Sequence, residues 1–252
     1  MSTEELYKGE EIVLRLDQIR ARIRDACERS GRDQKDVELI AVSKTKPYQA
    51  IEAAYQAGVL NFGENYVQEL NEKILTWNDK HLSDPVKWHM IGHLQKNKVK
   101  YLIGRVELIH SVDSIALAEQ IEKEAEKKDA VVKILMEVNI AAERTKFGLD
   151  PSSAAEAARQ INSLPHVRLL GLMTSAPYTE DPETNRLYFR RLNNLGQELL
   201  AQGLLATECE GYKLPVLSMG MSGDFEVAIE EGSTMIRVGT SVFGSRNYPN
   251  II

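Results

Sequence analysis

Short apolar runs alternate with amphipathic helical patterns along the chain. Each run has the β-branched and aliphatic content of a buried strand and ends in a polar tip, and a helical pattern follows the tip. Eight such runs stand at residues 37–42, 59–62, 86–91, 106–110, 131–138, 167–173, 214–217 and 234–238. Strands that alternate with helices favour parallel βαβ units, and eight units favour closure into a barrel. We therefore predict an α/β fold, a (β/α)8 TIM barrel, with a doubly wound open sheet as the main alternative.

The helical patterns have recognisable starts and ends. We expect a helix that opens at Pro47, one that reaches Leu102 after the third run, one that begins at Pro151 behind the cap Asp150, and a long one over about residues 182–203. Proline suits the first turn of a helix because its missing N–H group has no intrahelical partner there.

The residues before the first run predict one further helix, which Gly31 ends. Ser2 and Glu5 fit a capping box. Apolar side chains then recur at helical spacing, at Ile12, Leu16, Ile19, Ile23 and Cys27. We expect residues 1–31 to cover the outside or the bottom of the barrel. The chain of 252 residues has no linker or composition break, so we expect a single domain over residues 1–252 without a second β domain.

Composition narrows the classes of partner. The formal net charge of −6 argues against non-specific attraction to nucleic acid or to anionic lipid. Cys27 and Cys209 match no metal-ligand spacing and suit a reducing compartment. The start of the chain does not resemble a secretory leader, and no apolar run approaches the ~20 residues of a membrane helix. We expect a cytoplasmic protein that binds no nucleic acid, membrane or metal.

The first apolar run ends in a lysine, Lys44, which Pro47 follows closely. In a parallel barrel, the carboxyl ends of the strands form the mouth of the active site. If the strand alternation continues, Ile40, Val42 and Lys44 share one face. Burial against apolar side chains lowers the pKa of an ammonium and yields a neutral amine that can condense with an aldehyde. From this stretch alone, an ordinary surface lysine is the alternative.

The tips of the last two strands are rich in glycine and hydroxyl groups, at residues 218–223 and 237–241. Backbone amides in such loops favour a phosphate, and the last two loops of these barrels commonly bind one. Closure of the barrel would bring Lys44 beside them. Pyridoxal 5′-phosphate (PLP) carries both an aldehyde and a phosphate. A Schiff-base sugar-phosphate aldolase is the competing interpretation, but the sequence supplies no further acid/base set for it.

Five motifs carry a resemblance to a known family. They are AVSKTKP at 41–47, FGENYVQE at 62–69, WHMIGHLQ at 88–95, LSMGMS at 217–222 and RVGT at 237–240. From about residue 37 to residue 248, the chain resembles the YggS/PROSC family of pyridoxal phosphate homeostasis proteins. The resemblance implies a PLP fold-type III barrel like the N-terminal domain of alanine racemase.

The resemblance also implies roles for single residues. Lys44 would form the Schiff base, Asn65 would lie beside the cofactor, and Arg237 would face the pyridine nitrogen. The expected cofactor-binding residues at the last two loops are Ser218, Met219, Gly220, Ser222, Gly239 and Thr240. We expect Met173 and Thr174 to line the pocket. The alternative role for Arg237 is a structural cation paired with Glu64 or Glu226.

Together these features predict a protein of vitamin B6 and amino-acid homeostasis that holds PLP on Lys44, buffers it and delivers it to apo-enzymes. A permanent cation at the pyridine nitrogen disfavours protonation of the ring and makes it a poorer electron sink. A small amino-acid racemase that uses Lys44 as its base is the alternative. The sequence assigns no catalytic residue, since the candidate bases at strand tips also suit capping or packing: His89, His93, Ser175 and Tyr178. We expect a monomer.

Overall fold

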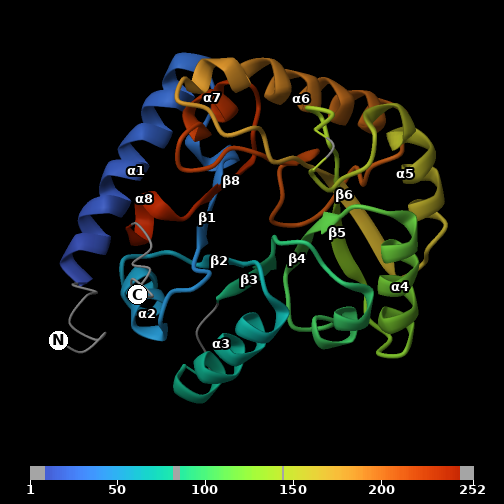
Figure 1. Cartoon of the computed structure of the whole chain (residues 1–252), viewed down its shortest axis with the longest axis horizontal. Helices are drawn as coiled ribbons and strands as arrows, with labels where there is room; N and C mark the ends of the chain where they lie inside the picture. Colours follow the sequence, from blue (N-terminus) through green and yellow to red (C-terminus); the bar gives the residue numbers. More distant parts are fainter. Residues whose placement is uncertain (1–8, 82–85, 144, 245–252) are drawn as a thin grey trace.

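The computed structural model describes residues 9–81, 86–143 and 145–244, and its eight parallel strands close into a barrel (Figure 1). The strands follow one another around the barrel in sequence order, and the last pairs with the first. They are β1 (Glu38–Val42), β2 (Asn61–Glu64), β3 (Lys87–Met90), β4 (Leu108–Val112), β5 (Val132–Glu137), β6 (Val167–Met173), β7 (Val216–Ser218) and β8 (Met235–Val238). The predicted (β/α)8 barrel is confirmed, and the open sheet is excluded.

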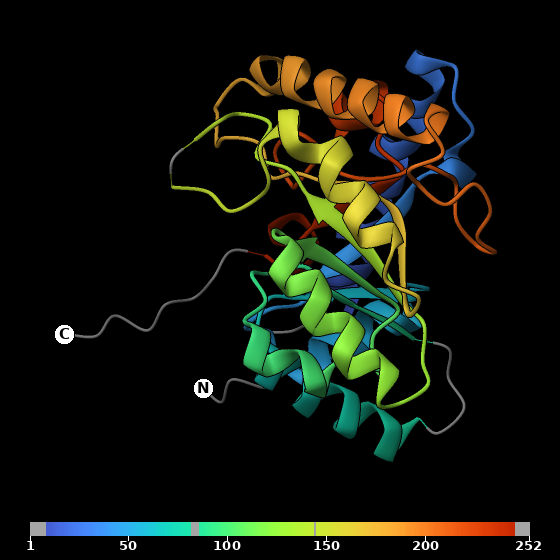
Figure 2. The ribbon, with the colours of Figure 1, turned by 90° about the vertical axis from the view of Figure 1, so that its right-hand side faces the viewer.

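Helices surround the strands (Figure 2). The α-helices after the strands are α2 (Tyr48–Gln56), α3 (Val67–Lys80), α4 (Ile115–Glu126), α5 (Ala154–Asn162), α6 (Arg186–Ala201), α7 (Phe225–Glu230) and α8 (Thr240–Phe243), and the 3-10 helices are η2 (Gln34–Asp36), η3 (Lys96–Tyr101), η4 (Pro151–Ser153) and η5 (Pro182–Asn185). A large apolar core fills the space between strands and helices. A smaller one fills the barrel interior, with Ile40, Leu108, Leu135, Leu170, Met173, Val216 and Met235.

Several predicted elements differ in detail. The element after β3 is η3 rather than an α-helix, and within its lysine-rich sequence only Val99 is buried. The helices predicted at Pro151 and Pro182 begin as the 3-10 turns η4 and η5. Strand β2 starts two residues later than the apolar pattern suggests, because the Val59 N–H closes the end of α2 on the Ala54 carbonyl. The capping box at residues 2–5 lies outside the described residues.

The N-terminal helix α1 (Gly9–Ser30) covers the outside of the barrel, as predicted. It packs against α2, α7 and α8 (Figure 1). Since α7 and α8 are short, the apolar face of α1 supplies the cover that longer helices would give to this side of the sheet. No helix in the described part of the chain is long and apolar enough to cross a membrane.

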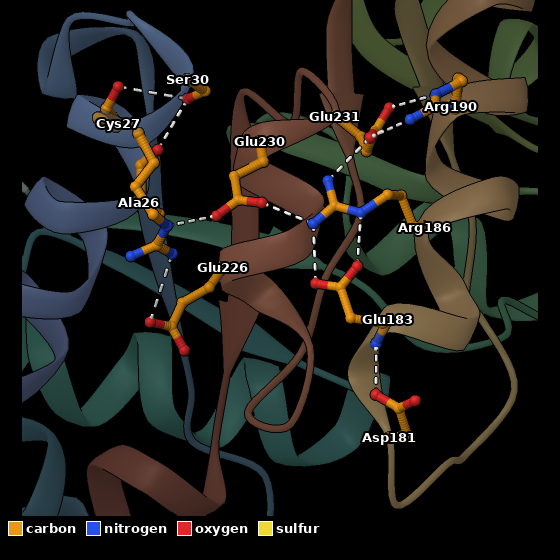
Figure 3. Close-up of polar contacts among 11 residues, drawn as sticks. Ala26, Cys27, Ser30, Asp181, Glu183, Arg186, Arg190, Glu226, Glu230 and Glu231 are labelled. Carbon is orange, nitrogen blue, oxygen red and sulfur yellow. Dashed lines mark hydrogen bonds and ion pairs between the residues drawn. The ribbon is translucent and has the colours of Figure 1, made fainter.

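A network of ion pairs fastens α1 to the C-terminal helices (Figure 3). The Glu230 carboxylate accepts from Arg29 of α1 and from Arg186 of α6, both at 2.7 Å. Glu231 accepts from Arg186 at 2.9 Å and from Arg190 at 2.8 Å. Hydrogen bonds with Glu183, Glu230 and Glu231 raise the pKa of Arg186. Single exposed pairs contribute little, but a shared network orients several helices at once.

A bulge in β6 allows the strands to approach closely at one point. The register between β5 and β6 shifts after Ile134, so that Leu135 pairs with Gly171 rather than with Leu170. A Cβ atom on Gly171 would lie 2.0 Å from the Val216 carbonyl oxygen on β7. The neighbouring strand backbone therefore requires glycine at this position.

We expect Gly171→Ala to lower the free energy of unfolding by roughly 3 kcal/mol, since backbone must move to admit the methyl group. Chemical denaturation would measure the change. Gly9→Ala is the matched control, because its new Cβ would meet only the Ala53 Cβ at 3.9 Å. A Gly171→Ala protein as stable as this control would contradict the prediction.

Candidate cofactor-binding site

A cavity of about 380 Å³ lies at the carboxyl ends of the strands. Pairing of β1 with β8 sets Ile40 opposite Arg237 and Ala41 opposite Val238, so the segments after these strands meet at the barrel mouth. Most of the predicted cofactor-binding residues line this cavity: Lys44, Asn65, Ser222, Arg237, Gly239 and Thr240. Residues nearly 200 positions apart are thereby brought together around one small space.

Lys44 stands over the barrel interior at the end of β1. Ile40 belongs to the interior core, and Val42 and Lys44 both line the cavity. The predicted alternation therefore continues past the end of the strand. Lys44 itself is half-buried. The chain then turns sharply, since Thr45 has a φ of +62°.

A buried charge cluster holds the backbone on both sides of Lys44. The Lys73 ammonium on α3 donates to the Ser43 carbonyl oxygen at 2.8 Å, to Glu64 at 2.6 Å and to Glu69 at 2.7 Å. Glu64 also accepts from the Ser43 hydroxyl at 2.6 Å. Glu69 accepts from the Thr45 N–H at 2.6 Å. Ser43 and Thr45 are thus both fixed by the same three charged groups.

Burial dominates the electrostatics of this cluster. Desolvation raises the pKa of the Glu64 carboxyl from its ordinary value of 4.5, and the Lys73 charge and its hydrogen bond oppose that rise. An ammonium that is shared by two carboxylates offsets part of the cost of burying them. Sequence reasoning missed Lys73, because a lysine four residues after a glutamate on a helix is usually a surface pair.

Arg237 is almost completely buried beneath the cavity, with 4% of its surface exposed. Its guanidinium donates to the carbonyl and hydroxyl oxygens of Ser218, both at 2.8 Å, and to the Thr174 carbonyl at 2.9 Å. Burial lowers the pKa of Arg237 to about 10, and the charges of Glu137 and Asp224 oppose that shift. The group therefore remains a cation at neutral pH.

The pairing with Glu64 or Glu226 that was suggested for Arg237 as a structural cation is wrong. Glu64 pairs with Lys73 at 2.6 Å, and Glu226 pairs with Arg22 at 2.7 Å. The hydrogen bonds of Arg237 go to neutral oxygens instead. Its side chain lies inside the barrel, whereas α7, which carries Glu226, lies outside.

Hydroxyl and amide groups form the opposite rim of the cavity. The Ser222 hydroxyl accepts from the N–H groups of Gly239 and Ser241, at 3.3 and 3.4 Å. Asp224, which also lines the cavity, accepts from the Met221 N–H at 2.7 Å and from the Asn185 amide at 2.9 Å. Asp224 was not among the predicted site residues. In the structure it holds the loop that carries Ser222.

Three predicted cofactor-binding residues lie below the cavity rather than in its lining. Ser218 is buried under Arg237. Met219 points outward into the core between strands and helices. Gly220 has a φ of +90°, and a Cβ there would be 2.6 Å from the Ala228 Cβ. Because side chains alternate along the strand, Ser218 points into the barrel and Met219 points out of it. The turn at Gly220 then places Ser222 at the cavity.

Two residues that were expected to line the pocket also lie below the cavity. Met173 belongs to the interior core, and Thr174 presents its carbonyl to Arg237 and donates its hydroxyl to the Val138 carbonyl at 2.8 Å. Ser175, the next residue, does line the cavity. The pocket wall on β6 is therefore displaced by one or two residues toward the carboxyl end.

The candidate bases occupy different environments. His89 is fully buried among other polar groups, and His93 lies 3.0 Å from Asp113 and stacks on Phe147. Ser175 and Tyr178 line the cavity, but Tyr178 is 93% exposed. None of them combines a place in the cavity with a partner that would activate it.

One titratable group near the site was overlooked in the sequence. Burial raises the pKa of Glu137 to about 7, with Asp113 adding to the rise and Arg237 opposing it. Glu137 stands at the end of β5, where Lys133 is the only other charged residue of the strand. Among the described residues, no group of three histidine, cysteine or acidic side chains is placed to bind a metal ion.

The chemistry of these donors fits PLP. The cavity offers one primary amine, one buried guanidinium and, opposite them, a rim of hydroxyl and backbone N–H groups. At that rim a Cβ on Gly239 would lie 3.3 Å from the Val42 Cβ and carbonyl oxygen, so glycine lets this loop pack closely on the end of β1. A ligand with an aldehyde and an anionic group would complement these donors, since the aldehyde can react with the amine and the anion can accept hydrogen bonds from the rim.

Comparison with known proteins agrees with this geometry. Residues 14–247 match the family model described as alanine racemase, N-terminal domain. A pyridoxal phosphate homeostasis protein of Aquifex aeolicus is 47% identical over 234 residues, which cover 93% of this chain and 98% of the relative. The solved structure of PipY from Synechococcus elongatus with PLP bound has a TM-score of 0.78 and 35% identity, covering 92% of this chain and all of that one.

The fold and the match to the family model define the class: an alanine racemase N-terminal-domain barrel. Within that class, the chain belongs to the family of pyridoxal phosphate homeostasis proteins. The resemblance found in the motifs is thereby confirmed.

The charge cluster beside Lys44 yields a stability prediction. Lys73→Met should lower the free energy of unfolding by about 3–5 kcal/mol at pH 7.5, because it leaves buried carboxylates without their cation. Since the folded-state pKa of Glu64 is already raised, protonation relieves this penalty, so the loss should shrink as the pH falls toward 4.5. Denaturant titrations at pH 7.5 and at pH 4.5 would measure the change in the free energy of unfolding.

Two comparisons make this test specific. The double variant Glu64→Gln with Lys73→Met should recover part of the lost stability, because it removes one of the uncompensated charges. Lys127→Met removes an exposed ion pair with Glu124 and should change the stability far less. A pH-independent penalty at Lys73 would contradict the electrostatic explanation.

Proposed function

We propose that the protein binds PLP in the cavity at the barrel mouth, with Lys44 as the residue of covalent attachment, and keeps the cofactor available for other proteins. The observation that carries the proposal is the convergence of Lys44, Arg237 and the Ser222–Gly239 rim on one cavity of about 380 Å³. The names of the relatives and the PLP reported in PipY support the same ligand.

Each end of the cavity has a role in this proposal. The chemistry that PLP supplies when bound is a reactive aldehyde, with which the Lys44 amine condenses reversibly. Ser222, Gly239 and Thr240 provide hydroxyl and N–H groups for the phosphate. Asn65 lines the wall beside Lys44. The Gly92 backbone packs against Asn65, since a Cβ on Gly92 would lie 2.5 Å from the Asn65 carbonyl oxygen.

Arg237 favours storage of the cofactor over catalysis. A guanidinium has only donors, and its pKa of about 10 keeps it charged. A cation facing the ring nitrogen disfavours protonation of that nitrogen and so weakens the ring as an electron sink. Together with the names of the relatives, this argues against the racemase alternative.

Delivery to PLP-dependent apo-enzymes is the partner relation that we propose. The outer rim is accessible, since Thr240 and Gly223 are exposed at the end proposed for the phosphate. A partner could therefore approach the cofactor from the mouth of the barrel. We propose that the protein acts as a monomer.

The cysteines support a cytoplasmic setting for this exchange. Cys27 is a buried free thiol within α1, and Cys209 is a free thiol in the segment before β7. Free thiols persist in reducing compartments. Burial also raises the pKa of Cys27, which keeps that thiol unreactive.

The attachment residue is tested by trapping. Borohydride reduction of the PLP-loaded protein, followed by peptide mapping, should place the cofactor on Lys44. Lys44→Arg keeps a cation but cannot condense, so it should lose the visible absorption band and the label. Lys46→Arg is the matched control and should keep both. Label on Lys46, or an unchanged band in Lys44→Arg, would contradict the assignment.

Carrier and racemase functions make opposite predictions. The loaded protein should restore activity to a PLP-dependent apo-enzyme in a coupled assay, and Lys44→Arg should not. It should exchange the α-proton of amino acids in D₂O no faster than free PLP does. Exchange at enzymatic rates would favour the racemase instead.

A further inference from the structure

A chain of polar side chains crosses the otherwise apolar interior of the barrel. At its upper end, the Arg237 guanidinium donates to the Ser218 hydroxyl at 2.8 Å. That hydroxyl lies 2.8 Å from His110 Nδ1, and His110 Nε2 lies 3.0 Å from His89 Nδ1. Ser218, His110 and His89 are all completely buried. The proposed function uses only the first member, Arg237.

The chain continues to the opposite end of the barrel. His89 Nε2 lies 3.0 Å from the Asn61 amide oxygen, and the Asn61 amide nitrogen donates to Glu38 at 3.3 Å. Asn61 and Glu38 line a second cavity of about 280 Å³ at the amino ends of the strands, whereas Arg237 lines the cavity at the mouth. One hydrogen-bonded path therefore joins the two ends of the barrel.

The carboxylate at the lower end sets the direction of this path. An ionised carboxylate only accepts, so Asn61 must turn its NH₂ group toward Glu38 and its oxygen toward His89. His89 must then carry its hydrogen on Nε2, which leaves Nδ1 as an acceptor. His110 must in turn donate from Nε2, and its Nδ1 accepts the hydroxyl hydrogen of Ser218.

The direction has a consequence at the upper end. Because the Ser218 hydrogen points to His110, both lone pairs of the hydroxyl oxygen remain available, and one of them accepts from Arg237. The opposite direction would need a flipped Asn61 amide and a proton on Glu38. The protonation state of Glu38 is thus linked to the direction of the hydroxyl hydrogen of Ser218, which contacts the Arg237 guanidinium.

Burial supports neutral rings in the middle of the path. Desolvation lowers the pKa of His89 to about 3 and that of His110 well below its ordinary value of 6.5. Nearby cations add to the effect, Lys87 and Lys133 at His89 and Arg237 at His110, while Glu107 opposes it at His89. Each neutral ring has one donor and one acceptor, as a one-way path requires.

We propose that His110, His89, Asn61 and Glu38 are positioning residues for Arg237, acting as a one-way hydrogen-bond chain that ends on the Glu38 carboxylate. The relevance to the cofactor rests on the proposed function, whereas the direction of the chain does not. The test therefore uses the full-length protein without PLP, so that failure of one proposal is distinguishable from failure of the other.

Nitrogen NMR of the imidazole rings tests the direction. In ¹⁵N-labelled protein at pH 7.5, His89 and His110 should both show an unprotonated Nδ1 and a protonated Nε2, with assignments from His89→Gln and His110→Gln. A hydrogen on Nδ1 of either ring, or an imidazolium, would overturn the proposal. Apart from the two variants used for assignment, this measurement needs only the wild-type protein.

Two variants that each replace a carboxylate by a neutral amide test the role of Glu38. Glu38→Gln supplies both a donor and an acceptor, so both directions become possible, and the His110 nitrogen signals should move toward an average of the two tautomers. The guanidinium signals of Arg237 should shift with them. Glu107→Gln removes a neighbouring carboxylate that hydrogen-bonds Lys133 and Tyr212 instead, and it should leave these signals in place.

Equal responses to the two variants would show a general charge effect and would overturn the role of Glu38. The absence of any response to Glu38→Gln would overturn it as well. Circular dichroism and denaturant titration would verify that both variants are folded.

Discussion

The hydrogen bonds between β1 and β8 are the constraint on which the site depends. Their register sets Ile40 opposite Arg237, so the tip that carries Lys44 lies beside the tips that carry Arg237 and Gly239. Because the paired segments are nearly 200 residues apart, this contact closes the barrel and depends on the tertiary fold rather than on any local pattern. The extra helix α1 protects the seam by packing over α2, α7 and α8.

The protein stabilises its two buried cations in different ways. Lys73 is surrounded by two carboxylates and a carbonyl, so its charge is compensated locally and the backbone around Lys44 is held in place. Arg237 contacts neutral oxygens, and the acidic groups that favour its charge act from a distance. Among the residues that the structure describes, no carboxylate pairs directly with Arg237, which suits a role toward a ligand in the cavity.

Much of the candidate site could be predicted because its signals are local. Lys44 ends an apolar run, and the glycines and hydroxyls of the last two loops stand at strand ends, where ligands bind in this fold. The sequence did not separate Ser218, Met219 and Gly220, which lie beneath the cavity, from Ser222, which lines it. That distinction depends on how the loop turns at Gly220. Lys73 and Asp224 were missed because each also suits an ordinary role, as a surface ion pair and as a helix start.

The sequence by itself determined the barrel, its N-terminal helix and the place of Lys44 at a strand end, because hydrophobic periodicity and strand alternation are properties of neighbouring residues. Only the tertiary structure decided which charged side chains are buried and with whom they pair. Glu64 meets Lys73 rather than Arg237, and His89 joins His110, Ser218 and Asn61 inside the barrel. These contacts link different strands and helices, so they depend on register and packing that no local pattern specifies.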